Sequence, residues 1–174
     1  MHCLKPKISD SAPQQFRHAI ALNAPVSGQL QPLSDSTSPL LAMRMAGDGV
    51  LIKLTGTAIY APFNASLSCF LPTLQIVEWR ASNGLVARLT FEDDLSSLHG
   101  CGFTRYVNQG DSVEAGTLLC HIDKNKVKLA SPELRCALTI VNANKLTAIV
   151  PKAPSASGIA RVQSNVDTLM TLYI

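Results

Sequence analysis

The stretch GLVARLTF at residues 84–91 has the length and composition of one β-strand that begins at a glycine turn. Successive strand residues point to opposite faces, so the stretch has one apolar face and one mixed face. The apolar face carries Ala87, Leu89 and Phe91, and the other carries Val86, Arg88, Thr90 and Glu92. We expect the apolar face to pack in a core and the mixed face to be accessible.

Similar strand-length segments recur from residue 16 onward, separated by Gly, Pro, Asn and Asp. Examples are residues 49–54, 117–122 and 137–141, which are rich in aliphatic and β-branched side chains. Long helical periodicity is nearly absent, and short helical turns are expected only at 94–97 and 123–129. The pattern predicts an all-β sandwich or barrel of many short strands, with a flexible tail over 1–15 and a single domain over 16–174.

Composition excludes several classes of protein. The chain has 174 residues, of which 47% are hydrophobic, 16% charged and 5% aromatic, which suits one domain with an aliphatic core. Its net charge is only +3, and the densest basic stretch is Lys124, Lys126 and Lys128, so a nucleic-acid-binding groove is not indicated. Apolar runs such as 137–141 are far too short to span a membrane.

The five cysteines and four histidines show no metal-site or disulfide framework. The cysteine count is odd and no CxxC occurs, while the first 22 residues are polar and hold Pro6 and Pro13, unlike a signal peptide. We therefore expect reduced thiols and a cytoplasmic protein. The histidines are His2, His18, His99 and His121; they lack metal-ligand spacing, so neither a metal nor another cofactor is expected.

The turn residues carry a family resemblance. In order, they are Ala24-Pro25-Val26-Ser27-Gly28, Gly47-Asp48-Gly49, Ala61-Pro62, Gly84, Gly100-x-Gly102-Phe103, Gly110 and Gly116. This series resembles the glucose-type enzyme IIA domain of the bacterial sugar phosphotransferase system, from Ala24 to the C-terminus and more loosely after Ile122. The resemblance implies an antiparallel β-sandwich or barrel, the duplicated hybrid motif, with a shallow depression on one apolar face.

In that family, one histidine accepts a phosphoryl group from the small histidine phosphocarrier protein and passes it to a IIB domain. A second histidine supports the transfer, and the unphosphorylated form binds metabolic enzymes and transporters. At the matching positions this sequence has Thr90 and Gln75, while Thr73 matches. A phosphothreonine ester is much less reactive than a phosphoimidazole, and a neutral amide cannot move a proton near pH 7. The resemblance thus implies that neither histidine position is intact.

Three residues near these positions can also be compared with the residues that the family has there. Arg88 stands where the family usually has an apolar residue, and Glu92 where it has glycine. We expect the two to form an exposed ion pair across Thr90, on a face that is either simply solvated or a polar recognition patch. Asp94 matches a family position and is expected to be the N-cap of the short helical turn.

The family also has a hydrophobic rim that receives protein partners. The matching positions are Leu40, Leu41, Met45, Ala46 and Leu71. Their apolar character suits protein docking around a shallow depression, and the alternative is that they pack beneath a loop.

Three functions remain open. The first is a non-catalytic relative of enzyme IIA that binds the histidine phosphocarrier protein, a sugar permease or a metabolic enzyme and so regulates sugar uptake or metabolism. The second is a divergent but active phosphotransferase component, and the third is an unrelated binding module on the same fold. Whether the chain is an enzyme is therefore left undecided, with a non-enzyme favoured.

Overall fold

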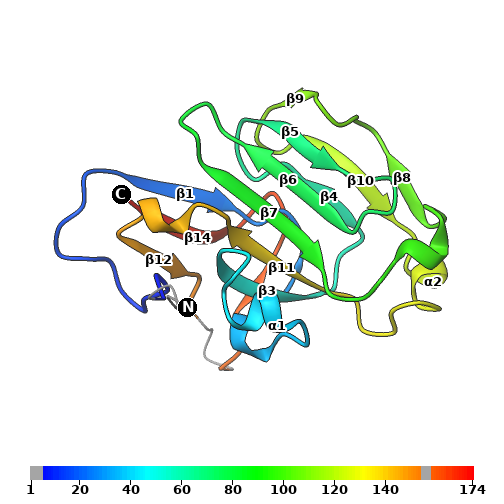
Figure 1. Cartoon of the computed structure of the whole chain (residues 1–174), viewed down its shortest axis with the longest axis horizontal. Helices are drawn as coiled ribbons and strands as arrows, with labels where there is room; N and C mark the ends of the chain where they lie inside the picture. Colours follow the sequence, from blue (N-terminus) through cyan, green and yellow to red (C-terminus); the bar gives the residue numbers. More distant parts are fainter. Residues whose placement is uncertain (1–5, 154–157) are drawn as a thin grey trace.

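The computed structural model describes residues 6–153 and 158–174 and is built mainly from antiparallel β-sheet (Figure 1). Its largest sheet has eight strands, all paired antiparallel. In spatial order they are β13 (Arg161–Val162), β2 (Gly28–Pro32), β3 (Asp48–Leu54), β11 (Arg135–Ile140), β7 (Val86–Phe91), β6 (Ile76–Arg80), β5 (Ala65–Phe70) and β9 (Ser112–Val113). The all-β prediction and the strand at 84–91 are confirmed.

Two three-stranded antiparallel sheets complete the architecture. One is β1 (Ala19–Asn23), β14 (Thr168–Tyr173) and β12 (Ala148–Pro151), and the other is β4 (Ala58–Tyr60), β10 (Leu118–Ile122) and β8 (Phe103–Arg105). The helical elements are single turns: η1 (Leu33–Asp35), α1 (Pro39–Ala42), η2 (Ser96–Leu98), α2 (Lys124–Val127) and η3 (Ala143–Lys145). Both expected turns are present, as η2 and α2, and the structure adds three others.

The main core lies on the inner face of the eight-stranded sheet and is closed by the smaller sheets. Its bulkiest fully buried side chains are Trp79, Phe70 and Phe91. Ala87 and Leu89 are also fully buried, as the alternation within β7 predicts. The outer face of β7 therefore carries Arg88 and Thr90.

A second, smaller core covers part of the outer face of the same sheet. Residues 33–47, here called the strap, contain η1 and α1 and pass over β3 and β11. Leu33 and Leu41 of the strap pack against Leu51 of β3 and Ala137 of β11. Because strand residues alternate between faces, Leu51 belongs to this outer core while Val50 and Ile52 belong to the main one.

Part of the segment expected to be a flexible tail is bonded to the domain. The backbone N–H of Lys7 donates to Oδ2 of Asp48 over 2.6 Å, and Ser9 donates to the carbonyl of Ile149 over 2.9 Å. Ile8 lies between them and packs against the main core. Residues 1–5 lie outside the described residues.

Within residues 6–153 and 158–174, the helices are all too short to cross a bilayer.

Candidate functional site

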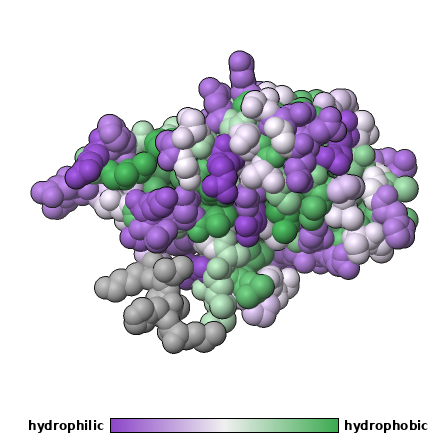
Figure 2. All heavy atoms as spheres, turned by 45° about the horizontal axis from the view of Figure 1, so that its top comes forward, coloured by the Kyte–Doolittle hydropathy of each residue, from purple (hydrophilic) through white to green (hydrophobic). Residues whose placement is uncertain are grey.

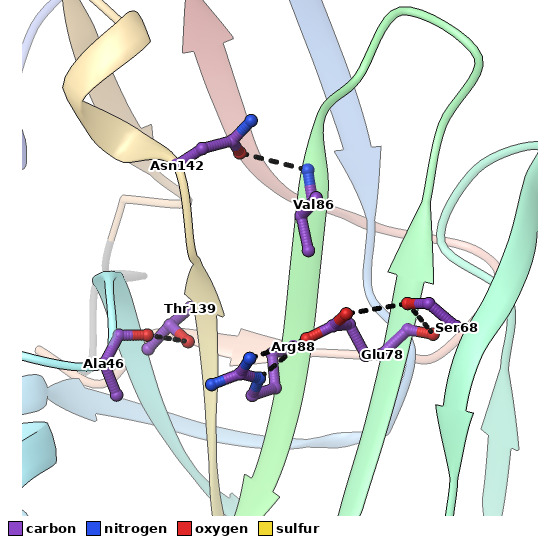
Figure 3. Close-up of polar contacts among 7 residues, drawn as sticks. All are labelled: Ala46, Ser68, Glu78, Val86, Arg88, Thr139 and Asn142. Carbon is purple, nitrogen blue, oxygen red and sulfur yellow. Dashed lines mark hydrogen bonds and ion pairs between the residues drawn. The ribbon is translucent and has the colours of Figure 1, made fainter.

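A row of polar side chains crosses the outer face of the large sheet (Figure 3). Strand register places Glu78 of β6 beside Arg88 of β7, and Arg88 beside Thr139 of β11. Nε and Nη2 of Arg88 both donate to Oε2 of Glu78, over 2.9 and 2.7 Å, and Ser68 of β5 donates to Oε1 over 2.7 Å. At the other end Thr139 donates to the carbonyl of Ala46 over 3.2 Å, which attaches the strap to the row.

The expected ion pair between Arg88 and Glu92 is wrong. Arg88 pairs with Glu78, while Oε2 of Glu92 lies 2.8 Å from Nε of Arg135 on β11. Residues four apart along an extended strand are separated by about 13 Å, whereas directly opposed residues on neighbouring strands are about 5 Å apart. Arg88 and Glu92 therefore each pair with a residue on a neighbouring strand and not with one another.

Glu92 is a buried anchor for the strap and not an exposed charge. Only 1% of its side chain is exposed. Its Oε1 accepts from the backbone N–H of Thr37 over 2.8 Å and from the hydroxyl of Ser36. One carboxylate thus joins β7, β11 and the strap.

Thr90 lies between these two ion pairs and is half-buried. Its cross-strand neighbours are Ile76 and Ala137, both apolar. Within the part of the chain that the structure describes, the Thr90 hydroxyl has no hydrogen-bond partner. A hydroxyl without an adjacent base is a poor nucleophile.

The Gln75 side chain is committed to the turn that follows β7. Its Nε2 donates to the carbonyls of Phe91, over 2.6 Å, and Asp93, over 3.1 Å, while its Oε1 accepts from the N–H of Leu95 over 3.2 Å. These bonds satisfy three backbone groups that the turn would otherwise leave unpaired. Thr73, two residues earlier, is half-buried in the loop between β5 and β6.

Asp94 contacts the start of η2, but one position before the cap. Leu95 occupies the N-cap position, whereas Oδ1 of exposed Asp94 accepts from the N–H of Ser96 over 2.9 Å. Hydrogen bonds from the Ser96 side chain and backbone hold the pKa of Asp94 below its usual value. The expectation of Asp94 as N-cap is therefore corrected to a turn-stabilising role beside the cap.

Two of the described cysteines are buried and have raised pKa values, which makes their thiols poor nucleophiles. Burial raises the pKa of Cys120 to about 11, and burial together with the charge of Glu92 raises the pKa of Cys136 well above its usual value. His99 and His121 are exposed, in a turn and in β10 respectively. No cluster of potential metal ligands occurs among the residues described.

The expected partner-binding residues divide between the surface and the second core. Leu40, Met45 and Leu71 are exposed, and Ala46 is half-buried. Leu41 is only 3% exposed because it packs on Leu51, so it is not available to a partner. Sequence reasoning missed Met43, an exposed apolar residue of the strap. On the face drawn in Figure 2, apolar residues reach the surface in several separate places between hydrophilic ones.

The Glu78 carboxyl makes folding stability sensitive to acid. Burial raises its pKa, but hydrogen bonds from Ser68 and Arg88 and the charges of Arg88 and Arg80 lower it, so that the pKa of Glu78 lies below its usual value in the folded protein. A depressed folded pKa means stability that is present above the unfolded pKa and is lost as pH falls through the folded value.

We expect Glu78→Gln to lower the free energy of unfolding by about 1–2 kcal/mol at pH 7, after discounting for the partial exposure of Arg88. The deficit should shrink as the pH falls below the ordinary pKa of a glutamate and through the lower pKa of folded Glu78. Urea unfolding of both proteins between neutral and acid pH measures this, with exposed Glu114→Gln as control. A deficit that is constant with pH would contradict the prediction.

Comparison with known proteins adds two findings. The model of the family described as phosphoenolpyruvate-dependent sugar phosphotransferase system, EIIA 1, matches residues 20–146. The fold is similar to that of the glucose permease IIA from Mycoplasma capricolum, with a TM-score of 0.76 and 23% sequence identity over 89% of this chain and 96% of that one. The structural likeness thus extends over more of the chain than the family match does.

Proposed function

Because this chain belongs to the EIIA 1 family of the phosphoenolpyruvate-dependent sugar phosphotransferase system, we propose that it acts in that system by binding a protein partner and not by carrying phosphate. Family membership supports a role in sugar phosphotransfer and transport. The absence of phosphoryl transfer is inferred from the chemistry of Gln75 and Thr90.

The arrangement of Gln75 carries the proposal. Both ends of its amide are engaged by backbone groups of the turn at 91–95, and an amide has no pKa near neutrality. Thr90 is consequently left without a base to take its proton, and the half-buried hydroxyl has apolar neighbours on both adjacent strands. Thr90 is therefore better placed to contact a protein partner than to attack a phosphorus atom.

The electrostatics of the same face support this proposal. Arg88 is neutralised by Glu78 and Arg135 by Glu92, so the two guanidinium groups nearest Thr90 already have carboxylate partners. Phosphoryl transfer relies on positive groups placed to receive developing negative charge. A face of balanced charge with apolar side chains beside it suits protein docking instead.

The surface proposed for the partner includes Thr90 and the exposed apolar residues around it. On the strap these are Leu40, Met43 and Met45, and in the loop between β5 and β6 there is Leu71. The bond from Thr139 to Ala46 attaches the strap to β11. Candidate partners are the histidine phosphocarrier protein, a sugar permease or a metabolic enzyme, and the proposal requires no cofactor.

Phosphoryl transfer to this chain gives the direct test. The purified protein is incubated with radiolabelled phosphoenolpyruvate, the upstream phosphotransferase and the histidine phosphocarrier protein. We expect no acid-labile phosphate on the chain, because positions 75 and 90 carry an amide and a hydroxyl and not an imidazole. Labelling of the native chain with acid-labile phosphate would sink the proposal.

Two variants separate the alternatives. Acid-stable phosphate that disappears in Thr90→Ala would show a divergent but active component that uses the threonine hydroxyl. Combining Gln75→His with Thr90→His restores a histidine at both positions. If the combined variant becomes labelled while the native chain does not, the phosphocarrier protein still docks on this face and only the chemistry is missing.

A further inference from the structure

α2 lies at one end of the molecule (Figure 1), and the chain that follows it carries an exposed apolar residue. Leu129 lies two residues after α2 and is 88% exposed, the highest value among the large hydrophobic side chains described. Val127, two residues earlier, is buried in the main core. The chain therefore turns outward immediately after Val127 and presents the leucine to solvent.

The outward turn is held by hydrogen bonds. The backbone N–H groups of Ala130 and Ser131 donate to the carbonyl of Val127 over 3.0 and 2.9 Å. At the other end of α2, the Asp123 carboxylate accepts from the N–H of Asn125 over 3.0 Å. The backbone on both sides of Leu129 is thus fixed, and its exposure is a property of the fold.

Four lysines belong to this end of the molecule, which we call the α2 corner (residues 123–134 together with Lys53). They are Lys53, Lys124, Lys126 and Lys128. Two carboxylates oppose them: Glu133 lies 2.6 Å from Lys53, and Asp123 lies 3.8 Å from Lys126. Lys128 is exposed and forms no ion pair with any residue that the structure describes. A third carboxylate, that of Asp93, accepts a hydrogen bond from Ser131 of the corner. The four lysines therefore exceed the carboxylates by one.

A hollow beside α2 opens among the same lysines. Its volume is about 260 Å³, and its charged lining consists of Lys53, Lys124 and Lys128 together with Glu133. Lys124 already makes one hydrogen bond within the protein, because its Nζ donates to the carbonyl of Thr55 over 2.5 Å. An ammonium has three donors, so further bonds to an anion remain available.

We propose that the α2 corner docks on an anionic lipid bilayer, with Leu129 inserted at the headgroup boundary and the lysines against the lipid headgroups. Basic residues around an exposed apolar side chain are the combination that holds proteins at such surfaces. Stable protein interfaces bury about 800 Å² on each partner, much more than one leucine offers, so the bilayer is favoured over an acidic protein. This inference is independent of the proposed function.

Flotation with vesicles tests the proposal on the full chain. One set consists of phosphatidylcholine, and the other contains roughly one third phosphatidylserine. We expect binding to the anionic vesicles at low salt, a partition coefficient about tenfold or more lower for Leu129→Ser, and weaker binding at high salt. Replacing Lys126 and Lys128 by glutamine should weaken it about fivefold for each lysine.

Matched controls come from the same chain. Val166→Ser removes another exposed apolar side chain, and Lys145→Gln another exposed lysine, and both should bind like the native protein. Equal binding to both vesicle types, or binding unaffected by Leu129→Ser, overturns the proposal. Retention on immobilised polyglutamate that depends on Lys126 and Lys128, without vesicle binding, overturns it in favour of an acidic protein partner.

Discussion

Replacing Glu92 by alanine is expected to lower the free energy of unfolding by about 2–4 kcal/mol and to release the strap from the sheet. The carboxylate is almost fully buried and serves Arg135, Thr37 and Ser36 at once. Its removal leaves the Arg135 guanidinium, which is 22% exposed, without its partner. Denaturant unfolding measures the stability, and amide hydrogen exchange measures the protection of residues 36–45.

Three further variants test whether the charge of Glu92 accounts for the loss of stability. Glu92→Gln keeps an oxygen for Thr37 but loses the charge opposite Arg135, so an intermediate loss is expected. Adding Arg135→Gln to Glu92→Gln should recover part of that loss, because the unpaired charge is gone. Exposed Glu114→Ala should change stability by no more than about 0.5 kcal/mol. Unchanged protection of the strap in Glu92→Ala would contradict its role as the anchor.

Gly49→Ala is expected to cost about 3 kcal/mol or more, through a steric clash inside the large sheet. A Cβ built on Gly49 would lie 1.9 Å from the carbonyl oxygen of Leu138 and 2.9 Å from Cα of Thr139. Both are backbone atoms of β11, so no side-chain rotation can relieve the overlap. β3 would have to move away from β11, and the attachment of the strap would move with it.

Gly110→Ala is the matched control for this glycine. Gly110 has a φ of +94°, and a Cβ there would have no neighbour within 4 Å. Only the conformational penalty applies, about 1–2 kcal/mol. Thermal or denaturant unfolding of the two variants side by side should rank Gly49→Ala as clearly worse, and equal losses would show that β3 can shift at little cost.

Local sequence patterns predicted much of the fold. Alternation within 84–91 identified both faces of β7, because side chains of a strand alternate whatever its neighbours are. Asp94 and Asp123 precede helical turns that the structure contains. The strap was not predicted, because η1 and α1 are single turns whose stability comes from packing on Leu51 and Ala137 and not from helical periodicity.

The candidate site shows where sequence reasoning stops. The identities of residues 75 and 90 can be read directly, and they determine which chemistry is available. The ion-pair partner of each charged side chain cannot be read from the sequence in the same way. Arg88 and Glu92 both occur on the expected face, yet their partners Glu78 and Arg135 come from different strands.

The sequence alone determined the strand pattern, the family resemblance and the identities of Thr90 and Gln75, because these depend on residue type and local order. Only the tertiary structure decided that Leu41 is buried, that Gln75 is committed to a turn and that Leu129 projects from the α2 corner. Such contacts depend on how strands far apart in the chain come into register. That register is set by the whole sheet and the two cores, and by no single segment.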